Sequence, residues 1–324
     1  MSKIAFIFPG HGAQICGMGQ DFYEQAETAK EIFDKASEIL GFSMPELCFE
    51  KNDRLDITEY TQPAMVTASI AMMKVFMERT GITPSVAAGL SLGEYPAMAA
   101  AGVMSAEDAI RTVRQRGILM QEAVPAGVGA MSAVLAMDGE KIEEVIAPIA
   151  GVQIANYNCP GQIVISGKKE AVDEAAVKLK EAGGQKGPPL KVPGRKEAGA
   201  RRVLPLNVSG PFHSSLLEEA GEKLGEVLAQ VEVHTPVIPY IANVTAGYVT
   251  DAGDVKPLLI KQVSSSVRWE QSIRRMLEDG VDTFIEIGPG RTLTGFMKKI
   301  DRNAKAMNIE KLEDIEKVKE ALGC

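Results

Sequence analysis

Ser91 stands at the centre of a Gly-x-Ser-x-Gly pentapeptide at positions 89–93, between a short apolar run and an Ala- and Met-rich segment. This spacing is typical of a nucleophile elbow, in which a serine on a sharp strand-to-helix turn is exposed to substrate. Glycines on either side leave room for the turn, and the following helix directs backbone N–H groups at the same place. Such N–H groups stabilise an anionic oxygen. The pattern predicts acyl chemistry on Ser91, although serines between glycines also occur in ordinary loops.

A serine nucleophile requires a base, and the sequence contains three histidines. His11 lies in a glycine-rich turn, and His234 lies in a predicted surface approach to a strand. His213 follows a Gly-Pro pair that ends regular structure just after a predicted strand, which places its imidazole on a loop near strand ends. Elimination favours His213 as the base, with a structural histidine as the alternative. Because no acidic residue suggests itself as a third member, we expect a dyad whose imidazole is oriented by a backbone carbonyl.

A predicted helix over residues 109–121 carries an arginine on its apolar face. Arg116 lies three residues after Val113 and four before Met120, both on the apolar stripe of that helix. A buried guanidinium must be paired, either with a structural carboxylate or with an anionic ligand. Structural pairs are the commoner case, so the pattern leaves both interpretations open.

Three segments of the chain repeat the order strand, glycine turn and helix, and these must position the reactive groups. They begin at residues 3, 85 and 282. Strands that alternate with helices indicate a parallel sheet covered on both faces, and sites in such sheets lie beyond the carboxyl ends of the strands. The N–H of His11 is therefore a candidate oxyanion donor opposite the elbow. The turn at 288–290 lacks the lysine of a phosphate loop and is interpreted as structural.

The pattern between residues 128 and 206 differs from the rest, because its elements follow the order β-α-β-β-α-β of a ferredoxin-like unit. The predicted fold class is therefore α/β: a hydrolase-like large domain with a parallel sheet, formed by residues 1–127 and 207–324. The ferredoxin-like small domain, residues 128–206, is inserted in it.

Composition and charge exclude several classes of protein. The chain of 324 residues is 45% hydrophobic and 24% charged, as expected of a globular protein. Its net charge of −8 argues against a nucleic-acid partner. No apolar run approaches membrane-spanning length and no signal-peptide core is present, so we expect a cytoplasmic protein without a membrane partner. The four cysteines, Cys16, Cys48, Cys159 and Cys324, lack metal-ligand spacing and are interpreted as free thiols, with no metal site.

Six motifs together resemble the malonyl-CoA:acyl carrier protein transacylases, and they occur in the order found in that family over nearly the whole chain. They are Ile-Phe-Pro-Gly-His-Gly-Ala-Gln at 7–14, Gly-Leu-Ser-Leu-Gly-Glu at 89–94, Arg-Gly-Ile-Leu-Met-Gln-Glu-Ala at 116–123, Asn-Tyr-Asn-Cys-Pro-Gly-Gln-Ile-Val-Ile-Ser-Gly at 156–167, Val-Ser-Gly-Pro-Phe-His-Ser at 208–214 and Glu-Ile-Gly-Pro-Gly at 286–290. Several motifs in a fixed order make the resemblance specific.

The resemblance implies a catalytic scheme and its residues. Malonyl-CoA would acylate Ser91 with His213 as base, and the backbone N–H groups of His11 and Leu92 would form the oxyanion hole. Arg116 would bind the malonyl carboxylate, and acyl carrier protein would accept the acyl group. No metal or other cofactor is implied.

Two further residues and three departures also follow from the comparison. Gln262 matches a family glutamine near the base, and Phe212 resembles the malonyl-selecting form, which would crowd an α-methyl branch. The family often has Gln where His11 stands and His where Leu90 stands. The first change is harmless if only the backbone N–H acts, whereas the second removes a polar neighbour of the serine. Residues 184–199 form an insertion rich in Pro and Gly that the family pattern lacks, predicted to be a mobile loop.

Several alternatives remain open at the level of sequence. The acceptor could belong to fatty-acid or polyketide synthesis, a serine esterase would share the elbow, and a non-catalytic docking module would share the fold. We expect a monomer. Residues 184–202 contain six basic residues and one acid, so this segment is either a solvated loop without consequence or a patch that steers an acidic carrier protein.

Overall fold

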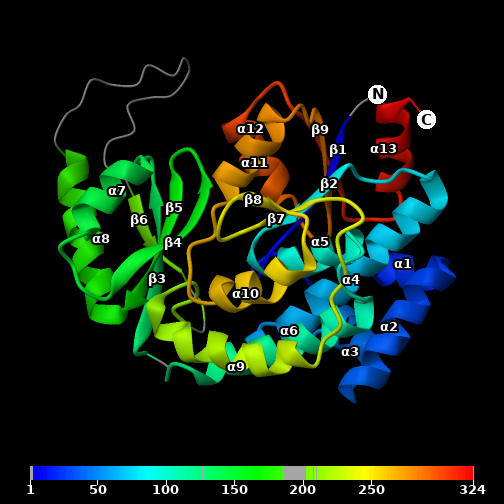
Figure 1. The fold of residues 1–324 in the computed structure, drawn as a ribbon, viewed down its shortest axis with the longest axis horizontal. Coiled ribbons are helices and arrows are strands. Elements are labelled where there is room, and N and C mark those ends of the chain that lie inside the picture. Colours follow the sequence, from blue (N-terminus) through cyan, green and yellow to red (C-terminus); the bar gives the residue numbers. More distant parts are fainter. Residues whose placement is uncertain (1–2, 126, 185–201, 207, 209, 324) are drawn as a thin grey trace.

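The computed structural model describes residues 3–125, 127–184, 202–206, 208 and 210–323. Two sheets organise the chain (Figure 1). The larger has the strand order β10 (Lys305–Ile309), β9 (Thr283–Ile287), β1 (Ile4–Phe8), β2 (Val86–Gly89), β7 (Tyr240–Ala242) and β8 (Gly247–Val249). Its first five strands are parallel, and β8 runs antiparallel to β7 at the edge. The predicted parallel sheet is confirmed.

Alternate residues of the central strands pack on opposite faces of this sheet, as the pleat requires. Phe6 and Phe8 of β1 belong to one core, under α4 (Thr58–Thr80) and α6 (Ala106–Glu122). Ala5 and Ile7 belong to the other, which contains Trp269 of α11 (Trp269–Glu278) and side chains of α12 (Thr292–Ile300). Burial on both faces explains why these strands are continuously apolar rather than alternating.

The other helices of the large domain pack against this sheet or against the helices that cover it. Their bounds are α1 Gln20–Gln25, α2 Glu27–Leu40, α3 Met44–Phe49, α5 Glu94–Ala100, α9 Glu218–Ala229, α10 Ala252–Gln262 and α13 Asp314–Leu322, with short 3₁₀ turns η1 Ser91–Gly93 and η2 Ser215–Leu217. Within the described ranges, no helix is long and apolar enough to cross a membrane.

The smaller sheet is antiparallel, with the order β4 (Val152–Cys159), β5 (Gln162–Lys168), β3 (Gly129–Leu135) and β6 (Arg202–Pro205). Helices α7 (Gly139–Ile146) and α8 (Lys169–Gly184) bury a separate apolar core against it. This order is that of a ferredoxin-like unit, so the predicted fold class is confirmed. The small sheet and its helices lie to one side of the large sheet (Figure 1). Apart from residue 184, the insertion at 184–199 lies outside the described residues, and so does the basic cluster at 184–202 except for Arg202 of β6.

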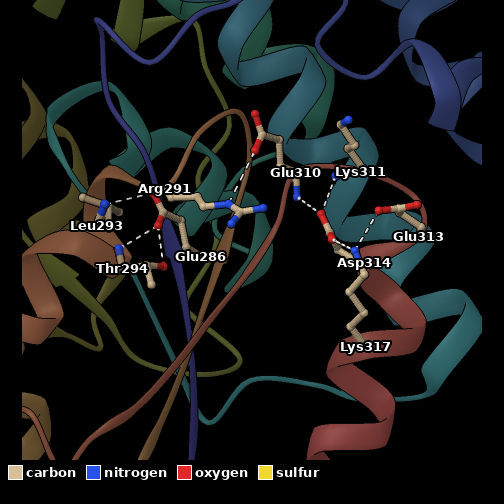
Figure 2. Close-up of polar contacts among 9 residues, drawn as sticks. All are labelled: Glu286, Arg291, Leu293, Thr294, Glu310, Lys311, Glu313, Asp314 and Lys317. Carbon is tan, nitrogen blue, oxygen red and sulfur yellow. Dashed lines mark hydrogen bonds and ion pairs between the residues drawn. The ribbon is translucent and has the colours of Figure 1, made fainter.

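On either side of the turn at 288–290, an acid of β9 contacts the start of α12 (Figure 2). Glu286 at the end of β9 is fully buried, and its carboxylate accepts hydrogen bonds from the N–H groups of Leu293, at 3.0 Å, and Thr294, at 2.7 Å. These N–H groups belong to the first turn of α12, where no intrahelical acceptor exists. A buried acid at this position therefore caps the helix, and the motif has a structural explanation.

Candidate active site

The predicted elbow at Ser91 is present: β2 ends at Gly89, Ser91 begins η1, and α5 follows from Glu94. The backbone of Ser91 is left-handed, with φ of 52°. A Cβ at Gly89 would overlap the carbonyl group of Gly93, and a Cβ at Gly93 would overlap that of Phe8. Glycine is therefore required at both positions by the close approach of backbone to backbone.

Asn243, just after β7, holds the elbow in place. Its Oδ1 accepts a hydrogen bond from the N–H of Ser91 at 2.6 Å, and its Nδ2 donates to the Gly89 carbonyl at 2.7 Å. Asn243 is 2% exposed. Sequence reasoning missed this residue, because β7 and β2 are neighbours only in the folded sheet. A signal was present in the polar residue that follows the apolar run of β7, at the carboxyl end of the sheet.

Ser91 and His213 form a hydrogen-bonded pair, with 2.6 Å between Oγ and Nε2. The other ring nitrogen, Nδ1, lies 2.9 Å from the main-chain oxygen of Gln262. Because a carbonyl only accepts, the proton sits on Nδ1 and Nε2 is left as an acceptor for the serine proton. The expected orientation by a backbone carbonyl is thus present. His234, in contrast, has a side chain that is 59% exposed beside Glu232.

The electrostatic environment keeps the His213 imidazole neutral. Burial, with a smaller contribution from the Arg116 charge, lowers its pKa to about 4. The same two causes lower the pKa of His11 to about 4, against a weaker opposing effect of Asp56. The backbone of His213 is also left-handed, with φ of 58°.

Arg116 is 2% exposed and lies beside the reactive serine. Its Nη1 donates to Gln62 Oε1 at 2.8 Å, and its Nη2 donates to Gln262 Oε1 at 3.1 Å and to Ser91 Oγ at 3.4 Å. All these partners are neutral, and no described carboxylate lies within ion-pair distance of the guanidinium. The sequence left open a structural ion pair or an anionic ligand for Arg116. The described residues do not form a direct ion pair with it. A buried cation with neutral partners favours an anionic ligand.

Gln262 connects the groups of the site. Besides its contacts to His213 and Arg116, its Nε2 donates to the Ser91 carbonyl at 3.0 Å and to Glu94 Oε2 at 2.8 Å. Gln262 is fully buried, and Glu94 is 1% exposed. The family resemblance pointed to Gln262, whereas no local signal distinguished Glu94 from other helix-start acids.

The proposed oxyanion donors lie on two adjoining backbone segments. A Cβ at Gly10 would be 2.5 Å from the Leu90 carbonyl oxygen, so the turn after β1 packs directly against the elbow. Leu92 belongs to the first turn of η1, where N–H groups lack intrahelical acceptors. The His11 ring packs at 5.7 Å, centroid to centroid, from that of Phe212, which is 7% exposed.

A pocket of about 210 Å³ opens between the two sheets at this point. Both the large sheet and the small one contribute to its walls, which are mainly apolar with a few polar groups. Its lining residues are Gly10, His11, Gln62, Leu90, Ser91, Arg116, Met120, Met131, Asn156, Asn158, Val164, Leu206, Val208, Phe212, His213, Thr292 and Phe296. A serine hydroxyl bonded to an imidazole, with a guanidinium beside it, in a mainly apolar pocket suits an acyl group that carries a negative charge.

The small sheet also contacts the base directly. Gln153 of β4 donates from Nε2 to the His213 carbonyl at 3.0 Å and to the Ser264 carbonyl at 3.2 Å, and its Oε1 accepts from the N–H of Ser215 at 3.0 Å. Sequence analysis did not identify Gln153. One amide therefore joins the smaller sheet to the loop of the base.

Known proteins resemble this chain over nearly its whole length. The family model for the acyl transferase domain matches residues 5–188. The malonyl CoA-acyl carrier protein transacylase of Bacillus subtilis (strain 168) is 47% identical over 321 residues, which are 98% of this chain and 96% of that protein. The crystal structure of the Clostridium perfringens malonyl CoA-acyl carrier protein transacylase superposes with a TM-score of 0.91 at 40% identity, covering 99% of this chain and 98% of that one. A malonyl-transacylase in complex with a type II PKS acyl-carrier protein superposes with a TM-score of 0.91 at 37% identity, covering 99% and 100%.

Proposed function

The chain belongs to the acyl transferase domain family and, within it, to the malonyl CoA-acyl carrier protein transacylases, and from this premise we propose its reaction. The enzyme transfers the malonyl group from malonyl-CoA to the phosphopantetheine thiol of acyl carrier protein, through an ester on Ser91, in fatty-acid synthesis. The observation that carries the choice of substrate is the buried Arg116 guanidinium, which lies 3.4 Å from Ser91 Oγ and, among the described residues, hydrogen-bonds directly only to neutral groups.

The acylation half-reaction follows from the dyad. Nε2 of His213 accepts the proton of Ser91 Oγ as the oxygen attacks the thioester carbonyl. The N–H groups of His11 and Leu92 stabilise the resulting oxyanion. When the tetrahedral intermediate collapses, the C–S bond breaks and the thiolate of CoA takes the proton from Nε2. The malonyl ester remains on Ser91, with its free carboxylate at Arg116.

The second half-reaction reverses these steps with a different thiol. The pantetheine thiol of the carrier gives its proton to Nε2 of His213, and its sulfur attacks the malonyl ester. Collapse breaks the bond to Ser91 Oγ, which recovers the proton from the imidazole. Malonyl carrier protein then leaves.

Intact-mass measurement after incubation with malonyl-CoA tests the proposal. We expect one malonyl adduct on the protein, its removal by holo acyl carrier protein, and no adduct on Ser91→Ala. An adduct that persists in the variant would disprove the role of Ser91, and an enzyme that releases malonate to water as fast as it acylates would be a serine hydrolase instead.

The polyketide alternative has support of its own in the likeness to a malonyl-transacylase of a type II PKS carrier. Comparing transfer rates to a fatty-acid carrier and a polyketide carrier decides between the two roles. We further propose that the enzyme is a cytoplasmic monomer, and analytical sedimentation would measure its mass in solution. Residues 128–206 form the inserted domain in this proposal.

A further inference from the structure

Glu94 is a buried carboxyl group next to the reaction centre that the mechanism above does not use. It begins α5, directly after the elbow, and is 1% exposed. Its Oε2 accepts hydrogen bonds from Gln262 Nε2 at 2.8 Å and from the N–H of Asn243 at 3.1 Å. Burying a carboxylate is costly unless it is paired, so its place beside the reactive groups requires an explanation.

Hydrogen-bond chemistry lets Glu94 determine the orientation of Gln262. An ionised carboxylate can only accept, so Gln262 must turn its NH₂ group toward Glu94 and its oxygen toward Arg116. The main-chain oxygen of the same glutamine holds the His213 ring, and Asn243, the other partner of Glu94, holds Ser91. One residue thus separates Glu94 from each of the three groups that act on substrate.

Charge links Glu94 to Arg116 in particular. The ionisable groups that face Glu94 are Arg116 of α6, Tyr95 of α5 itself and Tyr240 of β7. Burial raises the pKa of Tyr95 to about 12 and that of Tyr240 further, so both phenols are neutral near pH 7. His213 is also neutral there. Among the described residues, Arg116 is therefore the charged group that acts on Glu94, and the Gln262 amide lies between the two.

We propose that Glu94 is the counter-charge of Arg116 while the pocket is empty, and that an acyl carboxylate entering at Arg116 takes its place, with uptake of a proton by Glu94. Glu94 is a positioning residue in this scheme, and the inference rests on the proposed function. Burial raises the pKa of Glu94 to about 7, against the lowering effects of Gln262, Asn243 and Arg116, so the exchange falls in the neutral range.

Binding of the malonyl carboxylate and protonation of Glu94 favour each other. A second negative charge at Arg116 raises the pKa of Glu94 further, so protonated Glu94 favours the malonyl-bound state. Affinity for malonyl-CoA should therefore fall, relative to acetyl-CoA, as pH rises through about 7. Since one pKa unit corresponds to a factor of ten in the equilibrium, the ratio of the two affinities should change tenfold for each unit by which the acyl carboxylate raises the Glu94 pKa.

Titration calorimetry on the Ser91→Ala protein, which cannot be acylated at Ser91, measures the pH dependence of both affinities. We would titrate malonyl-CoA and acetyl-CoA between about pH 6 and about pH 8.5, in buffers of different ionisation enthalpy, to obtain both affinities and the protons taken up. Acetyl-CoA carries the same CoA moiety without the carboxylate, so the difference isolates the malonyl group. We expect net proton uptake for malonyl-CoA near pH 7 and none for acetyl-CoA.

Two further substitutions in the same background identify the group. Glu94→Gln keeps an oxygen that can accept both hydrogen bonds and removes the charge, so the affinity ratio should become independent of pH. Glu286→Gln is the matched control, since Glu286 is equally buried but bonded to the start of α12, and its ratio should follow the parent protein. Equal proton uptake for both ligands, or a ratio that Glu94→Gln leaves unchanged, would overturn the role of Glu94. Failure of the Ser91 enzyme to form a malonyl adduct would instead refute the proposed function.

Discussion

The His213 imidazole is ready to accept a proton at neutral pH because burial and the Arg116 charge hold its pKa at about 4. An ordinary histidine would be half protonated at pH 6.5 and unable to act as a base in that fraction. The lowered pKa makes the imidazole a weaker base but keeps it unprotonated throughout the physiological range.

This environment predicts the pH profile of acylation at saturating malonyl-CoA. The rate should stay level as pH falls from 8 to about 5 and decrease below that, because only then does His213 become protonated. Above about pH 5, where the imidazole is neutral, His213→Ala should lower the rate by roughly 10²–10⁴, as is usual for loss of a general base, and the difference should narrow below that pH. His234→Ala, on the surface, serves as the control. Rapid-quench acylation measures the rate, and a decline centred near pH 6.5 would contradict the buried environment.

The charge on Arg116 predicts substrate selectivity. Arg116→Ala should reduce malonyl transfer far more than acetyl transfer, since only the malonyl group carries a carboxylate, and such desolvated charge pairs are worth on the order of 2–5 kcal/mol. Arg114→Ala is the matched control, because Arg114 lies on the same helix but pairs with Glu59 at 2.7 Å, away from Ser91. Steady-state kcat/KM with both thioesters gives the comparison. An equal loss for the two substrates would indicate a structural role.

Local sequence signals were sufficient to find the proposed catalytic and binding groups and insufficient to find the residues that hydrogen-bond to them. Ser91 was identified from its flanking glycines, His213 from the loop around it and Arg116 from helical spacing. Asn243 gave only a weak signal, its place after the apolar run of β7, and Glu94 gave none, because each acts through contacts with segments that lie about 150 positions away in the chain. Glu94, buried by such distant contacts, has the local sequence pattern of a surface residue.

At the scale of elements, the elbow depends on backbone segments that pack too closely for a Cβ atom to fit between them. Gly93→Ala would place a methyl group on the Phe8 carbonyl, so β1 and the elbow would have to separate. We expect poor folding and no adduct formation. Gly295→Ala in α12 is the control, since that position has open space around it, and alanine favours a helix by about 1 kcal/mol over glycine. Thermal unfolding of both variants tests this, and a Gly93→Ala protein as stable as the parent would refute it.

The element predictions succeeded where a pattern was continuous. Apolar runs predicted β1, β2 and β9, and the change of pattern after residue 128 predicted the ferredoxin-like unit. The order of strands in the large sheet was not predicted, because it depends on which faces pack together rather than on local propensity. The contact of Gln153 with the loop of His213 was unpredictable for the same reason.

At the scale of the whole molecule, buried histidines make stability depend on pH. The pKa values of His11 and His213 are about 4 in the folded protein against 6.5 ordinarily, so between these values the unfolded chain binds up to two more protons. Glu94 acts in the opposite direction, because the folded protein keeps its proton between 4.5 and about 7. Two protons from the histidines minus one from Glu94 leave about one more proton bound to the unfolded chain. The free energy of unfolding should therefore fall as pH drops below about 6.5.

Urea unfolding at several pH values measures this dependence. We expect these groups to contribute a slope of about 1.4 kcal/mol per pH unit near pH 5, the value for one proton. His213→Ala removes one of the two histidines, so its slope should be smaller by a similar amount. An unchanged slope in that variant would show that His213 is not protected from protonation in the folded state.

Ser91 and His213 both hold a left-handed backbone, a conformation that glycine adopts without steric cost and other residues do not. The chemistry thus stands at two positions where the fold by itself would favour another amino acid. If selection acted on folding alone, both positions would change toward glycine. A mutant library screened only for thermal stability would therefore be enriched in glycine variants that are more stable but inactive. On the proposed mechanism, the two side chains are kept for turnover at the expense of stability.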